Sequence, residues 1–150
     1  MSKKNKKNFL IVDTSSFLYR AYHAMPDLRN KNNFPTGALT GIINMLRKTK
    51  EEWPCNFGVC VFDPKGPTFR TELYEEYKAN RTKMPEDLSR QINVIFEIIA
   101  AMGWPILSVK GFEADDVIGT LATLALKNGM QSTLISGDKD LSQQVRTELT

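Results

Sequence analysis

Short apolar runs alternate along this chain with segments in which apolar residues recur at three- and four-residue steps. The runs predict four buried strands, at Phe9–Val12, Gly58–Phe62, Ile106–Val109 and Ser132–Ser136. Helical spacing predicts helices around Leu39–Leu46, Ile92–Met102 and Val117–Ala125, another leaving Asp13, and the beginning of a last one in Leu141–Thr150. Strands that alternate with helices predict an α/β fold with a mainly parallel central sheet and helices on both faces.

One segment, Pro64–Arg90, departs from this alternation because it is long for a connection and rich in Tyr, Lys, Arg and Glu. On a helix, its residues Tyr74, Tyr77, Lys78 and Arg81 would share one face. Aromatic rings beside cations suit stacking on bases and contacts to phosphates. A surface helix whose tyrosines pack on the core is the alternative, and this pattern leaves both open.

Composition and charge narrow the class of protein but do not fix its function. The 41% hydrophobic and 25% charged content is typical of one globular domain, which we place at residues 9–150 after a basic flexible tail at residues 1–8. No apolar run is long enough for a membrane span or a signal peptide, so we expect a cytoplasmic protein. The net charge is +3, and four of the lysines lie in the first seven residues, so bulk charge does not establish nucleic-acid binding. Because the cytoplasm is a reducing compartment, Cys55 and Cys60 are expected to carry free thiols.

Acidic residues follow all four predicted strands. In a parallel sheet the carboxyl ends of the strands share one edge, where α/β folds bind ligands. Carboxylates gathered there repel one another unless a cation holds them together, and oxygen ligands of this kind suit Mg²⁺ or Mn²⁺. The pattern therefore predicts a metal centre for hydrolysis, with these candidate ligands: Asp13, Asp63, Glu113, Asp115, Asp116, Asp138 and Asp140.

Each acid taken alone has another interpretation. Asp is a common helix N-cap, Asp140-Leu141-Ser142-Gln143 fits a capping box, and acids in a first helical turn suit the helix dipole. A phosphoaspartyl enzyme built on Asp13 is disfavoured, because Ser15 stands where such enzymes carry a second Asp. The prediction of a metal centre therefore depends on the cluster as a whole.

Three further residues bear on the site. Arg20 lies on the helix after Asp13, from which it could reach a phosphate or extend into solvent. His23 is expected to be a surface or core residue, and Thr36 to be the N-cap of the next helix, whose N-terminus could receive a phosphate.

With these motifs, the chain resembles a known family, the N-terminal 5′-nuclease domain of bacterial DNA polymerase I, in the flap endonuclease and PIN-like group. The resemblance covers nearly everything from Phe9 to Val145 and is carried by LIVDTSSFLYRAYHAMP, PTGALTGIINMLR, VFDPKGPTFRTELYEEYKANR, MGWPILSVKGFEADDVIGTLA and LISGDKDLSQQV. It implies a 5′→3′ exonuclease and flap endonuclease that removes RNA primers and damaged DNA in replication and repair, with Mg²⁺ or Mn²⁺ as cofactor.

The resemblance also implies roles for individual residues. The seven acids would be ligands, and Pro64–Arg90 would form a helical arch through which a 5′ single strand passes. Lys78, Arg81 and Arg20 would act on phosphates in catalysis, and Tyr77 would meet a base. The nucleic-acid-binding set would be Tyr77, Lys78, Arg81, Arg20 and Arg70.

The implied partners are DNA with a 5′ flap or a single-stranded 5′ end, and RNA–DNA primer junctions. The resemblance also implies a location on the bacterial nucleoid and no membrane partner. In the family, a further acidic motif that completes a two-ion site and a helix-hairpin-helix element follow Asp140, and a polymerase domain follows in the full-length protein. Neither the motif nor the element is in this sequence. We therefore carry two hypotheses, a monomeric two-metal nuclease and a truncated, catalytically incomplete nucleic-acid-binding module that retains one metal site.

Overall fold

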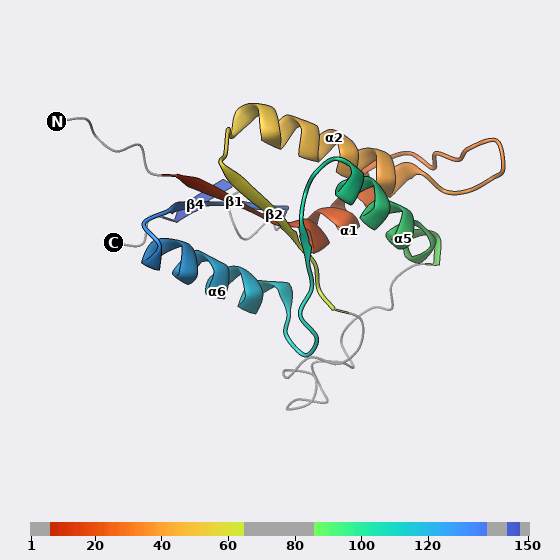
Figure 1. Cartoon of the computed structure of the whole chain (residues 1–150). Helices are drawn as coiled ribbons and strands as arrows, with labels where there is room; N and C mark the ends of the chain where they lie inside the picture. The colour runs from red at the N-terminus through yellow and green to blue at the C-terminus, as the bar shows by residue number, and fades with distance from the viewer. Residues whose placement is uncertain (1–6, 65–85, 138–143, 148–150) are drawn as a thin grey trace.

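The centre of the fold is a five-stranded sheet with the strand order β3-β2-β1-β4-β5 (Figure 1). The computed structural model describes residues 7–64, 86–137 and 144–147. Four strands are parallel: β1 (Asn8–Asp13), β2 (Phe57–Val61), β3 (Ile106–Leu107) and β4 (Gln131–Ser136). The last strand, β5 (Gln144–Thr147), is antiparallel to β4, so both Asn8 and Thr147 lie at the amino edge of the parallel strands.

In the described part of the chain, four helices cover the two faces of the sheet. They are α1 (Thr14–Ala24), α2 (Gly37–Glu52), α5 (Glu86–Ala101) and α6 (Ala114–Lys127). Helices α1, α2 and α5 lie on one face and α6 lies on the other (Figure 1). This is the mainly parallel α/β fold with helices on both faces that the sequence predicts.

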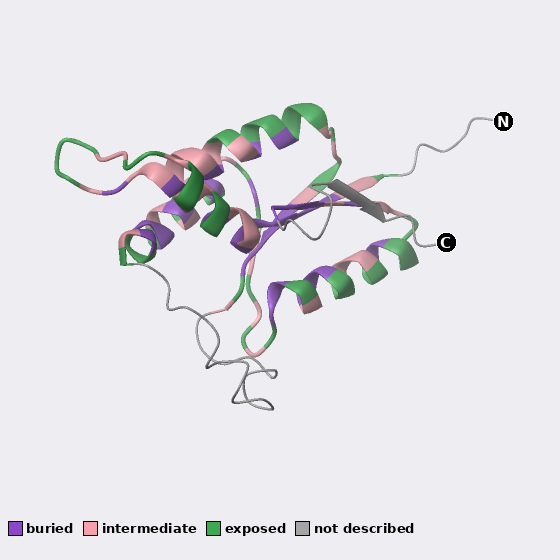
Figure 2. Ribbon diagram, turned by 180° about the vertical axis from the view of Figure 1, so that it is seen from behind, coloured by how far each residue is buried: buried purple, intermediate pink, exposed green. Residues whose placement is uncertain are grey.

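Each face of the sheet has its own apolar core, because side chains alternate along the strands. Leu10 and Val12 of β1 point into the core formed with α1, α2 and α5, whereas Ile11 points into the smaller core beneath α6. Figure 2 shows the same division, with buried residues along the sheet and on the inward side of each helix. β1 is almost completely buried because it is central to the sheet and covered on both faces.

Two predicted elements differ from the structure. The helix predicted to begin in Leu141–Thr150 is wrong for residues 144–147, which form β5 and pair with Ser132–Ile135 of β4. The backbone groups on the outer edge of β4 need hydrogen-bond partners, and this pairing supplies them. The third strand is also shorter than predicted, because it ends at Leu107 and the chain turns at Lys110 and Gly111, where Gly111 has a φ of 89°.

The long segment Pro64–Arg90 is only partly described. Residues 86–90 are the first five residues of α5, and residues 65–85 lie outside the described residues. The two alternatives for that segment, a substrate-binding arch or a packed surface helix, therefore remain expectations.

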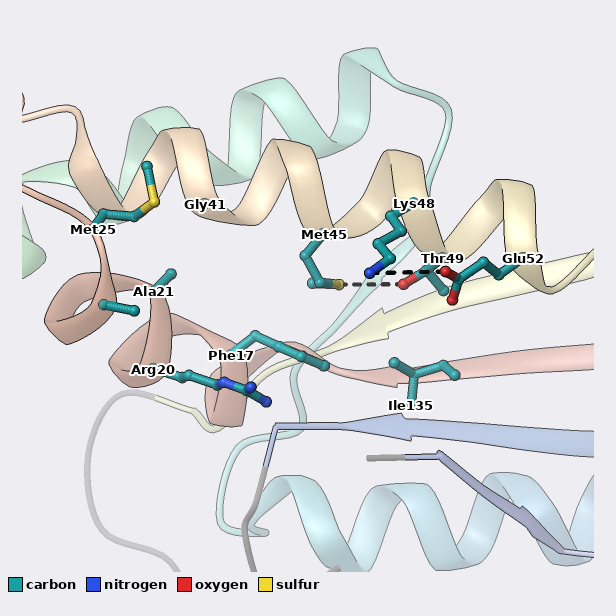
Figure 3. A pocket seen from close by; sticks show the side chains of 11 residues that line it. Phe17, Arg20, Ala21, Met25, Gly41, Met45, Lys48, Thr49, Glu52 and Ile135 are labelled. Carbon is teal, nitrogen blue, oxygen red and sulfur yellow. Dashed lines mark hydrogen bonds and ion pairs between the residues drawn. The ribbon is translucent and has the colours of Figure 1, made fainter. Parts of the chain in front are cut away.

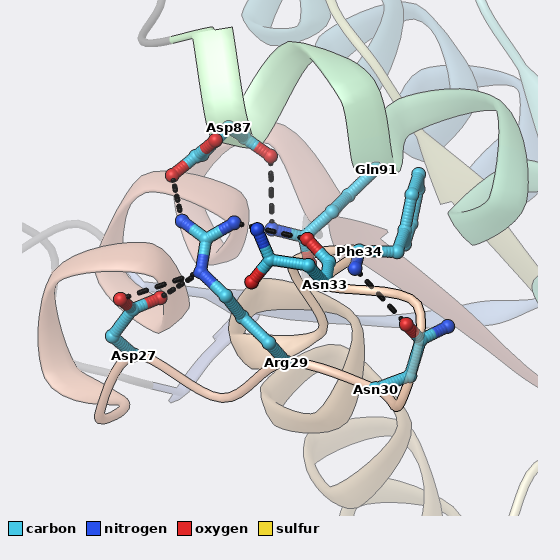
Figure 4. A network of polar contacts seen from close by, with 7 residues as sticks. All are labelled: Asp27, Arg29, Asn30, Asn33, Phe34, Asp87 and Gln91. Carbon is cyan, nitrogen blue, oxygen red and sulfur yellow. Dashed lines mark hydrogen bonds and ion pairs between the residues drawn. The ribbon is translucent and has the colours of Figure 1, made fainter.

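Side chains of α5 tie it to the loop between α1 and α2 (Figure 4). Arg29 Nη2 lies 2.6 Å from Asp87 Oδ2, and the Arg29 guanidinium also contacts Asp27 and the carbonyl oxygen of Asn33. The Gln91 side chain, only 1% exposed, accepts a hydrogen bond from Leu39 N–H and donates one to the Asp87 carbonyl oxygen. Gln91 thus satisfies one of the open N–H groups in the first turn of α2.

Candidate metal centre

The candidate site lies at the carboxyl edge of the sheet, beside the end of β1. The chain crosses from β1 to β2 on one face of the sheet and reaches β4 on the other side of β1 after crossing through α6. The strand order therefore changes direction at β1, and a crevice at such a switch point is where open α/β sheets bind ligands. Asp13, the last residue of β1, occupies this position.

Asp13 is a buried carboxylate with few compensating contacts. It is 8% exposed and is the N-cap of α1, with Oδ1 3.4 Å from Ser16 N and Oδ2 3.4 Å from Ser136 Oγ. Burial, together with repulsion from Asp115 and Asp63, raises its pKa from 3.8 to about 6, although the hydrogen bonds from Ser16 and Ser136 oppose the rise. The capping interpretation is thus correct for Asp13, but the capping hydrogen bond does not offset the free-energy cost of burying the charged carboxylate.

Asp63 follows β2 and connects it to α6. Its Oδ1 accepts a hydrogen bond of 2.8 Å from Ala114 N–H, in the first turn of α6, and its own N–H donates to Ser15 Oγ at 2.8 Å. The carboxylate remains exposed to solvent and within electrostatic range of Asp13. One of its oxygens is therefore held by the protein, while the residue stays exposed to solvent.

The other described acids lie at the start of α6. Glu113 occupies the N-cap position and is 6% exposed, without a capping hydrogen bond from its side chain, and Asp115 and Asp116 are in the first turn. Asp115 repels Asp13, whereas Asp116 lines an apolar groove of about 490 Å³ with Phe112 and Leu121 beside β3. Asp138 and Asp140 lie outside the described residues.

Asp13 therefore lies within electrostatic range of both Asp63 and Asp115, whose charges add to the effect of burial on its pKa. Over residues 7–64 and 86–137, no three His, Cys, Asp or Glu side chains already stand at the spacing of a metal site. The donor set nevertheless fits a hard divalent cation, because all the candidate ligands are carboxylate oxygens. A cation there would offset the repulsion that raises the pKa of Asp13.

Hydroxyl groups around Asp13 form part of the site that the sequence interpretation missed. Ser15, Ser16 and Ser136 all contact the ends of β1, β2 or β4. The usable signal is the run of three hydroxyl residues, Thr14, Ser15 and Ser16, directly after the strand-end acid Asp13.

Arg20 lies on the exposed side of α1, away from the packed core (Figure 3). With Phe17, Met45 and Ile135 it lines a cavity of about 300 Å³ between α1, α2 and β4. His23 is exposed at the end of α1, with its ring edge-to-face against Tyr22 at 5.2 Å, as expected for a surface residue. The remaining predicted contact residues, Arg70, Tyr77, Lys78 and Arg81, lie outside the described residues.

Thr36 is the N-cap residue of α2, as predicted, but its side chain makes no capping hydrogen bond. The polar pocket at this helix end, about 310 Å³, is lined by the carboxylates of Asp27 and Asp87 as well as by Gln91. Two carboxylates and an amide already bonded to Leu39 N–H do not suit a phosphate, so the geometry disfavours phosphate binding there.

Comparison with known proteins places the chain in a family. The family model described as 5′-3′ exonuclease, N-terminal resolvase-like domain, matches residues 8–150. The chain belongs to this 5′-3′ exonuclease family. DNA polymerase I of Pseudomonas aeruginosa is 47% identical over 141 residues, which are 94% of this chain and 15% of that polymerase. The 5′-3′ exonuclease of Buchnera aphidicola subsp. Baizongia pistaciae is 44% identical over 97% of this chain and 48% of that protein.

Solved structures agree on the fold. The bacteriophage T5 D15 flap endonuclease D155K variant, in a pseudo-enzyme-product complex with DNA and metal ions, matches with a TM-score of 0.64 at 19% identity, over 89% of this chain and 50% of that one. The catalytic core of Rad2 in complex with DNA substrate matches with a TM-score of 0.53 over 93% of this chain and 46% of that one. The chain thus spans at most about half the length of these relatives. None of the helices in the described part of the chain has the length and apolar character to cross a membrane.

Proposed function

We propose that this chain is the metal-binding part of a 5′-3′ exonuclease and flap endonuclease that hydrolyses phosphodiester bonds of DNA and of RNA primers in bacterial replication and repair. The observation that carries the proposal is Asp13 at the switch point, whose burial, with added repulsion from Asp115 and Asp63, raises its pKa to about 6. Membership in the 5′-3′ exonuclease family supports it.

The proposed ligands are the seven strand-end acids, and the proposed ions are two Mg²⁺ or Mn²⁺. When bound, such ions activate water and stabilise the leaving oxygen of a phosphodiester. Asp13 and Asp63 supply fixed negative charge at the centre of the edge, and the start of α6 holds one Asp63 oxygen. Around them, Arg20, Arg70, Lys78 and Arg81 are proposed to bind phosphates, and Tyr77 to stack on a base of the 5′ strand.

Cleavage of a labelled 5′ flap tests this proposal directly. The chain is incubated with the flap DNA in Mg²⁺ or Mn²⁺, beside Asp13→Asn and beside a reading frame extended to the length of the Buchnera exonuclease. We expect metal-dependent release of the labelled 5′ fragment that Asp13→Asn abolishes. An extended protein that fails to cut under any metal condition would contradict the proposed activity.

The same samples separate the second candidate, a binding module without turnover. The observation in its favour is that no three acidic side chains within residues 7–64 and 86–137 already stand at the spacing of a metal site. It predicts salt-sensitive flap binding that Lys78→Ala with Arg81→Ala weakens, while only the extended protein cuts. Equal flap affinity in the chain and in this double variant would count against it.

A further inference from the structure

Two serine hydroxyls in the first turn of α1 hold the ends of the strands on either side of β1. Ser15 Oγ accepts the N–H of Asp63 at 2.8 Å, across 48 positions of sequence. The β1–β2 ladder ends at the pair Asp13 and Val61, so Asp63 lies beyond its last rung. The Ser15 hydroxyl is therefore the contact that fixes the Asp63 backbone against β1.

Ser16 makes an equivalent contact on the β4 side of β1. Its hydroxyl donates to the Asp13 carbonyl oxygen at 2.7 Å and accepts the N–H of Gly137 at 2.8 Å, across 121 positions. The β1–β4 ladder ends at Asp13 and Ser136, so Gly137 also lies just past the last rung. The fit is close, because a Cβ on Gly137 would lie 3.1 Å from the Phe17 ring and 3.3 Å from the Ser16 carbonyl oxygen.

The contacts to Asp63 and Gly137 differ from the local bonds to nearby backbone groups that serines in a first helical turn ordinarily make, such as the one from Ser16 to the Asp13 carbonyl oxygen. Ser15 is 9% exposed, and both residues sit on a helix whose start is set by Asp13. Each hydroxyl thus holds a backbone N–H group just past the end of a strand that neighbours β1. Asp63 is itself a candidate ligand, and Ser16 also bonds to the backbone of Asp13, the other candidate ligand of this pair.

We propose that Ser15 and Ser16 are positioning residues of the metal centre. Ser15 holds the Asp63 backbone and Ser16 holds the Asp13 backbone, so that these two carboxylates stand at the spacing they need to share a cation. This inference rests on the proposed function, since it assumes that the acids bind metal. Residues outside the first ligand layer commonly change metal affinity tenfold or more when removed, because they orient the ligands.

Mn²⁺ binding to the 150-residue chain, followed by electron paramagnetic resonance, tests the proposal without any need for turnover. Ser15→Ala and Ser16→Ala are each expected to weaken Mn²⁺ binding about tenfold. The matched control is Ser132→Ala, a buried serine of β4 whose hydroxyl has no hydrogen-bond partner in the described part of the chain. This control should bind Mn²⁺ as the wild type does.

Three outcomes would overturn the proposal, and they are distinguishable. Wild-type Mn²⁺ affinity in both serine variants, with only a lower metal-free melting temperature, would reduce the serines to a structural role. A wild type that binds Mn²⁺ no better than Asp13→Asn would refute the metal centre itself, and the positioning role with it. If a variant fails to fold, amide hydrogen exchange in the wild type decides the question, since Asp63 and Gly137 N–H are expected to be protected and rapid exchange of both would refute the contacts.

Discussion

At the scale of single residues, Asp13 carries an electrostatic cost in the metal-free protein. Its pKa is about 6 in the folded chain against 3.8 for an ordinary Asp, mainly because it is buried. Between about pH 4 and pH 6 the native state therefore holds more protons than the unfolded state. The stability associated with protonated Asp13 is present below this window and is lost as the pH rises through it.

The substitution Asp13→Asn should remove this pH-dependent loss of folding stability. Without metal, at pH 8, the variant is expected to be more stable than the wild type by up to about 3 kcal/mol, because each pKa unit corresponds to about 1.4 kcal/mol. At pH 4 the two proteins should differ little. Thermal or urea unfolding in EDTA at the two pH values measures the difference, and a variant that is less stable at both would contradict the assignment of cost to the Asp13 charge.

At the scale of secondary-structure elements, the start of α2 depends on a residue from α5. Thr36→Ala is expected to cost less than about 0.5 kcal/mol, because the Thr36 side chain makes no capping bond. Gln91→Ala leaves Leu39 N–H without its side-chain acceptor and should cost about 2 kcal/mol. Urea unfolding of both variants makes the comparison, and equal losses would show that Gln91 does not act as the cap.

The packing of α1 on α2 gives a second test at this scale. A Cβ on Gly41 would lie 2.7 Å from the Ala21 Cβ, whereas one on Gly119, within α6, would meet nothing within 4 Å. Gly41→Ala is therefore expected to destabilise the chain by about 1–3 kcal/mol through overpacking. Gly119→Ala should instead stabilise it by about 0.5–1 kcal/mol. Calorimetric melting measures both, and a neutral Gly41→Ala would contradict the close helix contact.

These elements show what the sequence could and could not predict. Periodicity located the four parallel strands and the described helices α1, α2, α5 and α6, because each pattern is local. Acids at strand ends, through the geometry of a parallel sheet, predicted the candidate site at its carboxyl edge. The error at 144–147 arose because pairing with β4 decides that segment, and its own pattern does not reveal the pairing. The roles of Ser15, Ser16 and Gln91 were missed for the same reason, since their partners are 48, 121 and 52 residues away.

At the scale of the whole molecule, a bound cation should couple the strand ends to the stability of the fold. Mg²⁺ or Mn²⁺ at about one hundred times its Kd is expected to raise the melting temperature by about 5 °C or more at pH 8. The gain should shrink at pH 5, where protons compete for Asp13, and vanish in Asp13→Asn. Differential scanning calorimetry with Ca²⁺-free buffers tests this, and an equal gain in wild type and Asp13→Asn would place the cation elsewhere.

The antiparallel course of β5 has a practical consequence. Asn8 and Thr147 both stand at the amino edge, while Asp13 closes the opposite edge, about 20 Å away along a six-residue strand. A tether or fusion partner joined near either residue would therefore attach at the edge of the sheet opposite the candidate metal centre. Anchored to a bead or chip in this way, the chain would present its acidic edge outward, open to long nucleic acids that a tag on that edge would obstruct.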